Sequence, residues 1–370
     1  MESRSGRLVS RVLYAPLSWG LGHATRSIFF IRRLLEEGHE VVVAADGEAY
    51  VLLREAFPRV RMVRMPSCRI RYSRSLPAVW KILFSWPCLW RSAKREHRQV
   101  LTMVGEERFD RIISDHRYGV WHPDVRSELV IHQLWFRLPR GWRWLEPWLF
   151  RLHRRWLRPF DVLLVPDRRE EPVLAGILSH PPQKYLRRLP PVEYVGVMSR
   201  FLLPEYRREA VPAVPYDVLV LLSGPEPQRT VLERLLVRRL RHGPEKVLVV
   251  RGLPGRRQGG SAGQHVRLVA HLPPPLFYTY LRTTPLIIAR AGYTTIMDLV
   301  AVNRTALLIP TPGQTEQEYL AEHLEQQGMF LTLSQKQLQG REGTTLLRER
   351  LRELEKRTKK GDVTTPGEGS

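Results

Sequence analysis

Residues 11–45 read RVLYAPLSWGLGHATRSIFFIRRLLEEGHEVVVAA, and they contain the unit from which the rest of the fold is built. Short apolar runs at Arg11–Pro16 and Glu40–Ala45 predict two buried strands. Between them, apolar residues recur at helical spacing over His23–Glu37, and Gly38 follows as a helix stop. A strand, a helix and a second strand in this order predict a βαβ unit and therefore a parallel sheet.

Similar short runs continue the pattern through the rest of the chain. The further strands predicted in the first half are Val60–Met65, Arg111–Ser114, Leu129–His132, Asp161–Val165 and Val192–Val197. The second half alternates strands at Val218–Leu222, Lys246–Arg251, Val266–Ala270, Leu286–Ala289 and Thr305–Ile309 with helices at Arg229–Arg241, Pro274–Arg282, Thr294–Val302 and Glu316–Gln327. This alternation is typical of α/β proteins.

The alternation is interrupted over residues 199–216, which are rich in proline and charge and show no clear period. We interpret them as a linker between two doubly wound, Rossmann-like domains. The predicted domains are residues 1–198 and residues 217–340. Residues 341–360 predict a final charged helix, and residues 361–370 predict a flexible tail.

The chain is strongly basic, with 59 Lys and Arg against 37 Asp and Glu and a net charge of +22. A hydrophobic content of 43% excludes a disordered chain. Basic residues gather with tryptophan in Val79–Arg98 and Trp135–Arg158. This mixture suits the surface of an anionic membrane, and it also suits single-stranded nucleic acid, which we favour least. The remaining alternative is a pair of ordinary amphipathic helices with their indoles in the core.

Two further observations bear on location. No run of ~18 uncharged apolar residues is present, so no bilayer-spanning helix is expected. The N-terminus reaches its first strand too soon for a secretory signal. We therefore expect a cytoplasmic protein, held at the inner face of the cell membrane by peripheral contact.

The turn at residues 18–23, SWGLGH, joins the first predicted strand to the first helix. Gly20 and Gly22 allow the backbone to approach a ligand, and the helix N-terminus attracts anions. The third glycine of a dinucleotide fingerprint is missing, so NAD is not expected. His23 in the first helical turn and Asp115 at the end of a strand both point to the crevice at the strand ends. There the carboxylate can orient and stabilise the imidazole.

His132 and Gln133 follow the next strand and belong to the same edge of the sheet. We interpret His132 as a core residue rather than a catalytic one.

Polar loops follow three predicted strands of the second half. The first contains Ser223 and Gly224. The second contains Arg290, Gly292, Tyr293, Thr294, Thr295 and Asp298, and the third contains Gln314, Gln317 and Glu318. Helices that open in such loops bind phosphate at their N-termini, and their polar side chains suit a ligand rich in hydroxyl groups.

The block ARAGYTTIMDL at residues 289–299, followed by LLIPTPGQTEQEYLAEHL at residues 307–324, resembles the donor-nucleotide half of the GT-B glycosyltransferases. The resemblance is to family 28, which contains the peptidoglycan lipid-linked GlcNAc transferase and the plant galactolipid synthases. GLGHATR at residues 20–26 is similar to the glycine-rich loop of that family. The resemblance extends over about residues 8–340.

The resemblance implies a GT-B fold, with two Rossmann-like domains facing a central cleft. It also implies an inverting hexosyl transfer from a nucleotide diphosphate sugar, with UDP as the default nucleotide, to an acceptor hydroxyl on a lipid or lipid-linked glycan. His23 and Asp115 correspond to a catalytic dyad, and Asp298 to the acid that binds ribose, where the family more often has Glu. Gln317 and Glu318 correspond to the pair at the donor sugar, where a second Gln is expected.

No cofactor or metal is expected, because the chain has no D-x-D triplet. The helix N-terminus at Thr294 and Thr295, the Ser223–Gly224 loop and Arg290 would then stabilise the leaving diphosphate. Two alternatives remain: a sugar-nucleotide epimerase on the same fold, and a non-catalytic basic protein that binds a membrane or nucleic acid.

Overall fold

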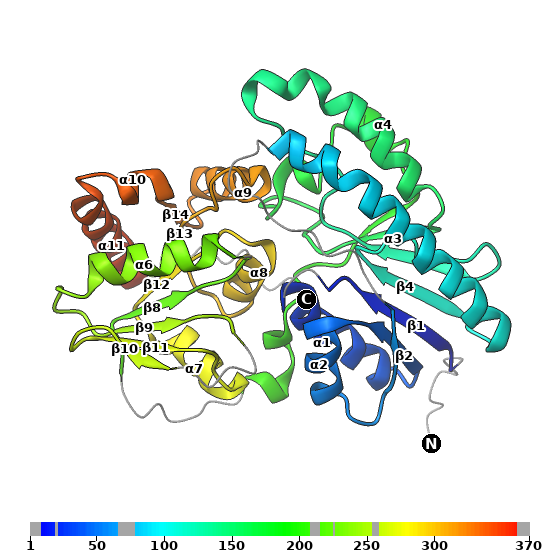
Figure 1. Cartoon of the computed structure of the whole chain (residues 1–370), viewed down its shortest axis with the longest axis horizontal. Helices are drawn as coiled ribbons and strands as arrows, with labels where there is room; N and C mark the ends of the chain where they lie inside the picture. The colour runs from blue at the N-terminus through cyan, green and yellow to red at the C-terminus, as the bar shows by residue number, and fades with distance from the viewer. Residues whose placement is uncertain are drawn as a thin grey trace.

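The computed structural model describes residues 9–18, 21–65, 78–207, 215–224, 226–253 and 259–360. The described chain folds into two α/β halves, each built on its own sheet (Figure 1). The two doubly wound halves predicted from the sequence are therefore confirmed.

The first half contains a seven-stranded sheet in the order β3-β2-β1-β4-β5-β6-β7, and each recorded pairing is parallel. Its strands are β1 (Arg11–Pro16), β2 (Glu40–Ala45), β3 (Arg61–Arg64), β4 (Arg111–Asp115), β5 (Arg126–Val130), β6 (Val162–Val165) and β7 (Val192–Tyr194). Its α-helices are α1 (Leu21–Glu36), α2 (Gly47–Ala56), α3 (Ala78–Glu106), α4 (Glu146–Leu157) and α5 (Gln183–Leu186). The strand order reverses between the parallel neighbours β1 and β4, and in open α/β sheets ligands bind at the carboxyl ends of the strands at such a point.

The second half repeats this design in the order β10-β11-β9-β8-β12-β13-β14, with only β10 recorded as antiparallel. Its strands are β8 (Val218–Leu221), β9 (Val247–Val250), β10 (Gly260–Ser261), β11 (Val266–Val269), β12 (Leu286–Ala289), β13 (Leu307–Leu308) and β14 (Leu331–Thr332). Its α-helices are α6 (Gln228–Leu240), α7 (Pro274–Thr283), α8 (Tyr293–Ala301), α9 (Thr315–Gln326), α10 (Gln335–Gln339) and α11 (Gly343–Lys360). The carboxyl ends of β8, β12 and β13 share one edge.

Between the sheets lie two short 3₁₀ turns, η3 (Arg200–Leu202) and η4 (Pro204–Tyr206). The rest of the predicted linker falls largely outside the described residues, as do Gly20 and the predicted tail.

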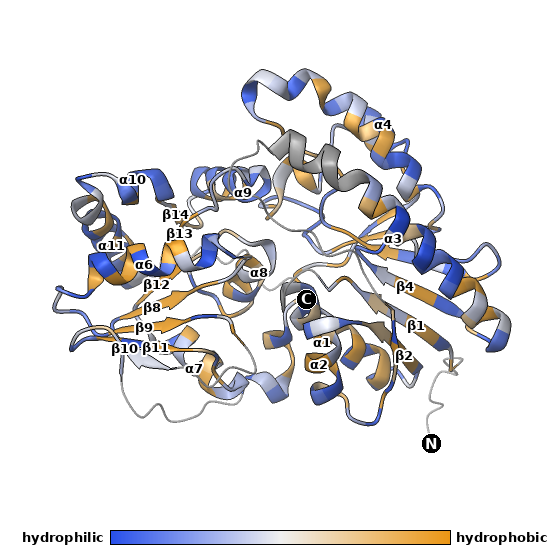
Figure 2. Ribbon diagram, in the orientation of Figure 1, coloured by the Kyte–Doolittle hydropathy of each residue, from blue (hydrophilic) through white to orange (hydrophobic). Residues whose placement is uncertain are grey.

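The central strands of both sheets are buried on both faces, as expected for parallel strands covered by helices. All four residues of β8 are buried, and so are all four of β9. Figure 2 shows these strands in apolar colours, whereas the covering helices carry polar residues on one side. Leu347, Leu351 and Leu354 of α11 join the core of the second half, so this charged helix packs along an apolar stripe.

One predicted strand is shifted. The sequence predicted Leu129–His132, but β5 begins at Arg126 and ends at Val130. Its middle residue, Glu128, is fully buried and accepts ion pairs from Arg111 at 2.5 Å and Arg126 at 2.9 Å. Burial of a carboxylate is tolerated here because it is paired. Since Glu128 interrupts the apolar run, the apolar pattern did not include the first residues of β5.

Among the described residues, no helix combines the length and apolarity needed to cross a bilayer.

Candidate active site at the carboxyl edges of the two sheets

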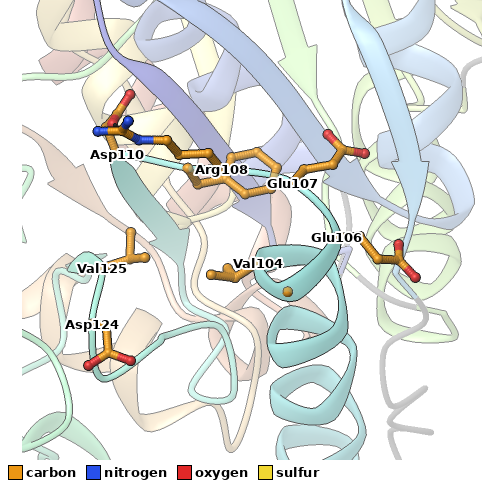
Figure 3. A pocket seen from close by; sticks show the side chains of 9 residues that line it. Val104, Glu106, Glu107, Arg108, Asp110, Asp124 and Val125 are labelled. Atoms are coloured by element: carbon orange, nitrogen blue, oxygen red, sulfur yellow. Dashed lines mark ion pairs between the residues drawn. The ribbon is translucent and has the colours of Figure 1, made fainter.

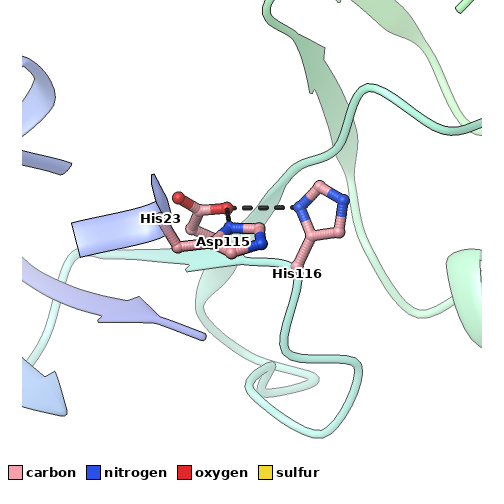
Figure 4. A group of neighbouring side chains, drawn as sticks. All are labelled: His23, Asp115 and His116. Carbon is pink, nitrogen blue, oxygen red and sulfur yellow. Dashed lines mark hydrogen bonds and ion pairs between the residues drawn. The ribbon is translucent and has the colours of Figure 1, made fainter. Parts of the chain in front are cut away.

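His23 and Asp115 meet because β1 and β4 are parallel neighbours, with Pro16 paired to Asp115. Helix α1 begins just after β1 and places His23 in its first turns. The Nδ1 atom of His23 lies 3.1 Å from Oδ1 of Asp115. Figure 4 shows the two side chains in contact, with His116 on the other side of the carboxylate. When Nδ1 carries the proton and donates it to this carboxylate, Nε2 is left as the basic nitrogen. The structure thus brings the two predicted catalytic residues together.

Arg26 lies one turn further along α1 and completes the ion pair with Asp115. Its Nη2 donates to Oδ1, and its Nε donates to Oδ2 at 3.3 Å. Both side chains are almost completely buried. Burial raises the pKa of Asp115, but the Arg26 charge and the neighbouring histidines outweigh it, so the pKa lies well below 3.8. Asp115 is therefore an anion at neutral pH.

The pKa of His23 is lowered from 6.5, chiefly because burial disfavours the imidazolium. Asp115 opposes this shift, while the Arg26 charge adds to it. His23 is consequently neutral at pH 7, which is the state a general base requires.

Two further histidines extend the site toward the second half. The His116 ring lies 4.8 Å from that of His23 and 5.0 Å from that of His132, measured between ring centroids. His132 stacks on Tyr293 with centroids 4.3 Å apart and planes 13° apart. Its Nε2 lies 2.9 Å from Oε1 of Glu316, in the first turn of α9. His132 therefore links the halves, a role that its interpretation as a core residue did not include.

The N-termini of α1 and α8 face each other across the boundary between the halves. A Cβ atom added to Gly22 would lie 2.9 Å from Oγ1 of Thr294, so this position holds no larger residue without movement. Gly292 begins α8 without a side-chain cap. Thr294 and Thr295 lie in the first turn that follows. Uncapped N–H groups and the helix dipole make this boundary attractive to a phosphate group.

Arg290 is engaged within its own half. Its guanidinium is fully buried and donates to the backbone carbonyls of Ile309 and Pro310, both at 3.1 Å, and of Gln228 at 2.9 Å. It also donates to Oε1 of Gln335 at 2.8 Å. Burial lowers its pKa to about 10, so the cation persists at neutral pH. These bonds hold the ends of β12 and β13 together, and the structure gives Arg290 a supporting position beneath the α8 loop.

The residues predicted at the donor sugar also hold their own loop. Oε1 of Gln317 accepts from the backbone N–H of Thr311 at 2.9 Å, and Oε1 of Glu318 accepts from that of Gly313 at 2.8 Å. Gln317 is buried and Glu318 is exposed. The backbone carbonyl of Gln314 accepts from the Glu318 N–H at 3.0 Å. These contacts fix the turn that opens α9.

Asp298, the predicted ribose ligand, accepts a 2.5 Å hydrogen bond from the hydroxyl of Ser199, beside η3. Burial raises its pKa to about 6, against the lowering effects of Arg200 and Ser199. Ser223 and Gly224 follow β8 on the edge shared with β12, and Gly224 has a φ of +90°, which favours glycine. The ligand roles predicted for all these residues stay predictions.

Sequence reasoning missed Arg26 and Glu316. Arg26 had a signal, because its spacing of three from His23 puts both on one face of α1. Glu316 had none, since its partner His132 lies 184 residues away.

A separate pocket lies at the opposite end of β4 (Figure 3). Its lining includes Glu106, Glu107 and Arg108 at the end of α3, together with Asp110 and Asp124. It borders the amino end of β4, whereas ligands of open α/β sheets bind at the carboxyl ends. We do not assign it to the active site.

Comparison with known proteins identifies the fold. Residues 277–364 match the glycosyltransferase family 28 C-terminal domain. No curated protein matches by sequence. The whole fold is similar to that of the glycotransferase of kitacinnamycin, with a TM-score of 0.62, 14% identity and coverage of 96% of this chain and 98% of that one. It is also similar to the spinosyn rhamnosyltransferase SpnG, with a TM-score of 0.61, 17% identity and coverage of 96% and 97%.

A third similar structure is Arabidopsis thaliana UGT89C1 complexed with UDP-L-rhamnose, with a TM-score of 0.58, 12% identity and coverage of 97% and 99%. The fold is therefore GT-B, and the chain resembles GT-B glycosyltransferases of the family 28 type. The findings support a glycosyltransferase as the enzyme class.

Proposed function

We propose that the protein is an inverting, metal-independent hexosyltransferase, which moves a sugar from a UDP-sugar to a hydroxyl group of a lipid or lipid-linked acceptor. The observation that carries this proposal is the boundary between the halves. There the base candidate His23 lies beside Asp115, and Gly22 abuts the uncapped N-terminus of α8. A proton acceptor and a phosphate-binding helix end are the two elements that sugar transfer from a diphosphate donor requires.

In this reaction the lone pair on Nε2 of His23 takes the proton of the acceptor hydroxyl. The hydroxyl oxygen forms the new bond to the anomeric carbon, whose bond to the diphosphate breaks on the opposite face. Asp115 stabilises the imidazolium that results. The N-terminus of α8 stabilises the charge that develops on the departing diphosphate.

A first test asks whether the protein recognises a nucleoside diphosphate. UDP bound only to the folded state at 100 times its dissociation constant stabilises the protein by about 2.7 kcal/mol. We expect UDP and UDP-sugars, but not uridine, to raise the melting temperature. Equal melting temperatures in the presence of UDP and of buffer would count against a nucleotide-sugar enzyme and leave a non-catalytic binding protein.

The lipid acceptor and the membrane contact rest on a second feature, the tryptophan face. We define it as Trp142, Trp144 and Trp148 with Arg140, Arg151 and Arg155. The three indoles are 46%, 73% and 50% exposed, and the three arginines are exposed as well. Trp135 of the same stretch is only 4% exposed and belongs to the core. Exposed indoles beside cations favour the interface of an anionic membrane. Each Arg near the surface contributes about 1 kcal/mol to the free energy of membrane binding.

Flotation with phosphatidylglycerol vesicles and with neutral vesicles tests this contact. We expect the protein to float with the anionic vesicles at low salt, and the triple variant Trp142→Ala/Trp144→Ala/Trp148→Ala to remain behind. Val51→Ala is the matched control, because Val51 is 56% exposed on α2, a different helix. Wild type that floats no better than the triple variant would remove the reason for a lipid acceptor.

A further inference from the structure

The pair His23–Asp115 belongs to a larger, partly buried cluster that contains a third potential ligand, His116. One ligand atom from each of the three residues lies within 4.8 Å of the others. Two imidazoles and a carboxylate are a donor set that transition metals accept. His116 also adopts a φ of +59°, an uncommon conformation for a residue with a side chain. This conformation turns the chain directly after β4.

The Arg26 guanidinium occupies the space among these atoms. Its Nη2 donates to Oδ1 of Asp115, lies 2.9 Å from Nδ1 of His23 and lies 3.5 Å from Nδ1 of His116. A metal ion would sit about 2.0–2.2 Å from the same three atoms. The guanidinium and a metal ion cannot share this position. A permanent cation held by the protein therefore stands where the cluster would bind a divalent ion.

We propose that Arg26 is a positioning residue that acts as the built-in cation of the cluster, excludes metal ions from it and keeps His23, Asp115 and His116 in one arrangement. The charges balance in this arrangement, because one arginine cation offsets one carboxylate while both imidazoles remain neutral. Nη2 has two hydrogens: one is donated to Asp115, and the other lies toward the two imidazoles, with Nη2 2.9 Å from Nδ1 of His23 and 3.5 Å from Nδ1 of His116. The catalytic meaning of this arrangement rests on the proposed function, whereas the exclusion of metal does not.

The experiment measures metal binding directly and needs no substrate. Zn²⁺ and Co²⁺ are titrated into the tag-free full-length protein and its Arg26→Ala variant. Melting temperature reports Zn²⁺, and visible absorption reports the coordination of Co²⁺. We expect Arg26→Ala to bind one metal ion at least about 100-fold more tightly than wild type, because the guanidinium both fills the site and repels a dication at ~4 Å.

Three matched variants make the result specific. Arg26→Lys keeps the charge and should keep the metal out. Arg33→Ala removes an exposed arginine from the same helix and should behave like wild type. Arg26→Ala/His116→Ala lacks one ligand and should lose the gained site.

The proposal is overturned by a folded Arg26→Ala variant that binds no more metal than wild type. It is also overturned by wild type that binds one metal ion in a manner that His116→Ala abolishes. If Arg26→Ala unfolds, refolding in the presence of Zn²⁺ supports the proposal, and failure to refold with Zn²⁺ overturns it. If Arg26→Ala gains the metal site while the wild-type protein shows no transferase activity, the proposed function is refuted and the role of Arg26 stands.

Discussion

The contact between Gly22 and Thr294 offers a direct test of the closed boundary between the halves. In Gly22→Ala the new Cβ would lie 2.9 Å from Oγ1 and 3.3 Å from Cβ of Thr294. Threonine is stiff about χ1, so α1 and α8 must separate by a few tenths of an ångström. Overpacking of this kind costs about 1–3 kcal/mol.

Because the strain falls on the proposed diphosphate site, part of it should appear as weaker UDP binding. A loss of 1.4 kcal/mol corresponds to about a tenfold change in affinity. Truncation in the double variant Gly22→Ala/Thr294→Ala removes the atom at 2.9 Å and leaves the nearest at 3.3 Å. We therefore expect the second change to restore much of the UDP affinity, with a coupling of about 0.5–3 kcal/mol between the two positions.

The assay combines urea denaturation with calorimetric titration of UDP for the four members of the cycle. Gly105→Ala is the matched control, since a Cβ at this helical position meets nothing within 4 Å. Gly22→Ala with the stability and UDP affinity of Gly105→Ala would refute the close approach of the two helices. If Gly22→Ala causes the same loss in the wild-type background and in the Thr294→Ala background, Thr294 is not its cause.

Three other predictions concern the site. His23→Ala should lower turnover about 10²–10⁴-fold in a UDP-release assay while UDP affinity stays near that of wild type; unchanged turnover would make His23 a structural residue. Because the pKa of His23 is lowered, the acid limb of kcat/KM should fall at a pH below 6.5, and a limb above 6.5 would contradict a buried neutral base. In the folded state the pKa of Asp298 is raised from 3.8 to about 6. Ionisation of Asp298 therefore lowers the free energy of unfolding as the pH rises through this range. Asp298→Asn should therefore raise the melting temperature above about pH 6 but not below about pH 4, and it should weaken UDP binding; unchanged UDP affinity would exclude Asp298 as the ribose ligand.

The fold was largely predictable because its signals are local. Strands such as Val218–Leu221 are continuous apolar runs, and α1 ends where Gly38 follows with a φ of +86°. The position of Asp115 beside His23 was also predictable, because the carboxyl ends of the parallel strands β1 and β4 lie at the edge of the sheet where α1 begins. What the sequence could not supply were contacts between distant residues that no periodicity encodes. One example is the pairing of Glu128 with Arg111, which allows a charged residue inside β5. Another is the contact of His132 with Glu316, which joins the two halves.

Arg290 shows a different limit of sequence reasoning. An arginine after a strand and before a phosphate-binding helix predicts an anion ligand, but in the structure its donors are directed to backbone carbonyls and Gln335. Only the folded structure shows which acceptors bind the N–H groups of a buried guanidinium. The sequence also could not show which tryptophans of residues 135–158 are buried: Trp135 lies in the core, whereas Trp144 is exposed.

The most direct measurement is the fate of the sugar when the purified protein is given a UDP-sugar with and without an acceptor alcohol, in the presence of EDTA. Diacylglycerol vesicles, a polyprenyl-linked sugar and a phenol serve as the acceptor panel, and proton NMR follows both products. We predict that UDP appears in equal amount to the transferred sugar, only when an acceptor is present, with the anomeric configuration inverted and with turnover lost in His23→Ala. Conversion of the UDP-sugar to its epimer without an acceptor, retention of configuration, or activity that EDTA abolishes and Mg²⁺ restores would contradict an inverting transferase that uses His23 and no metal.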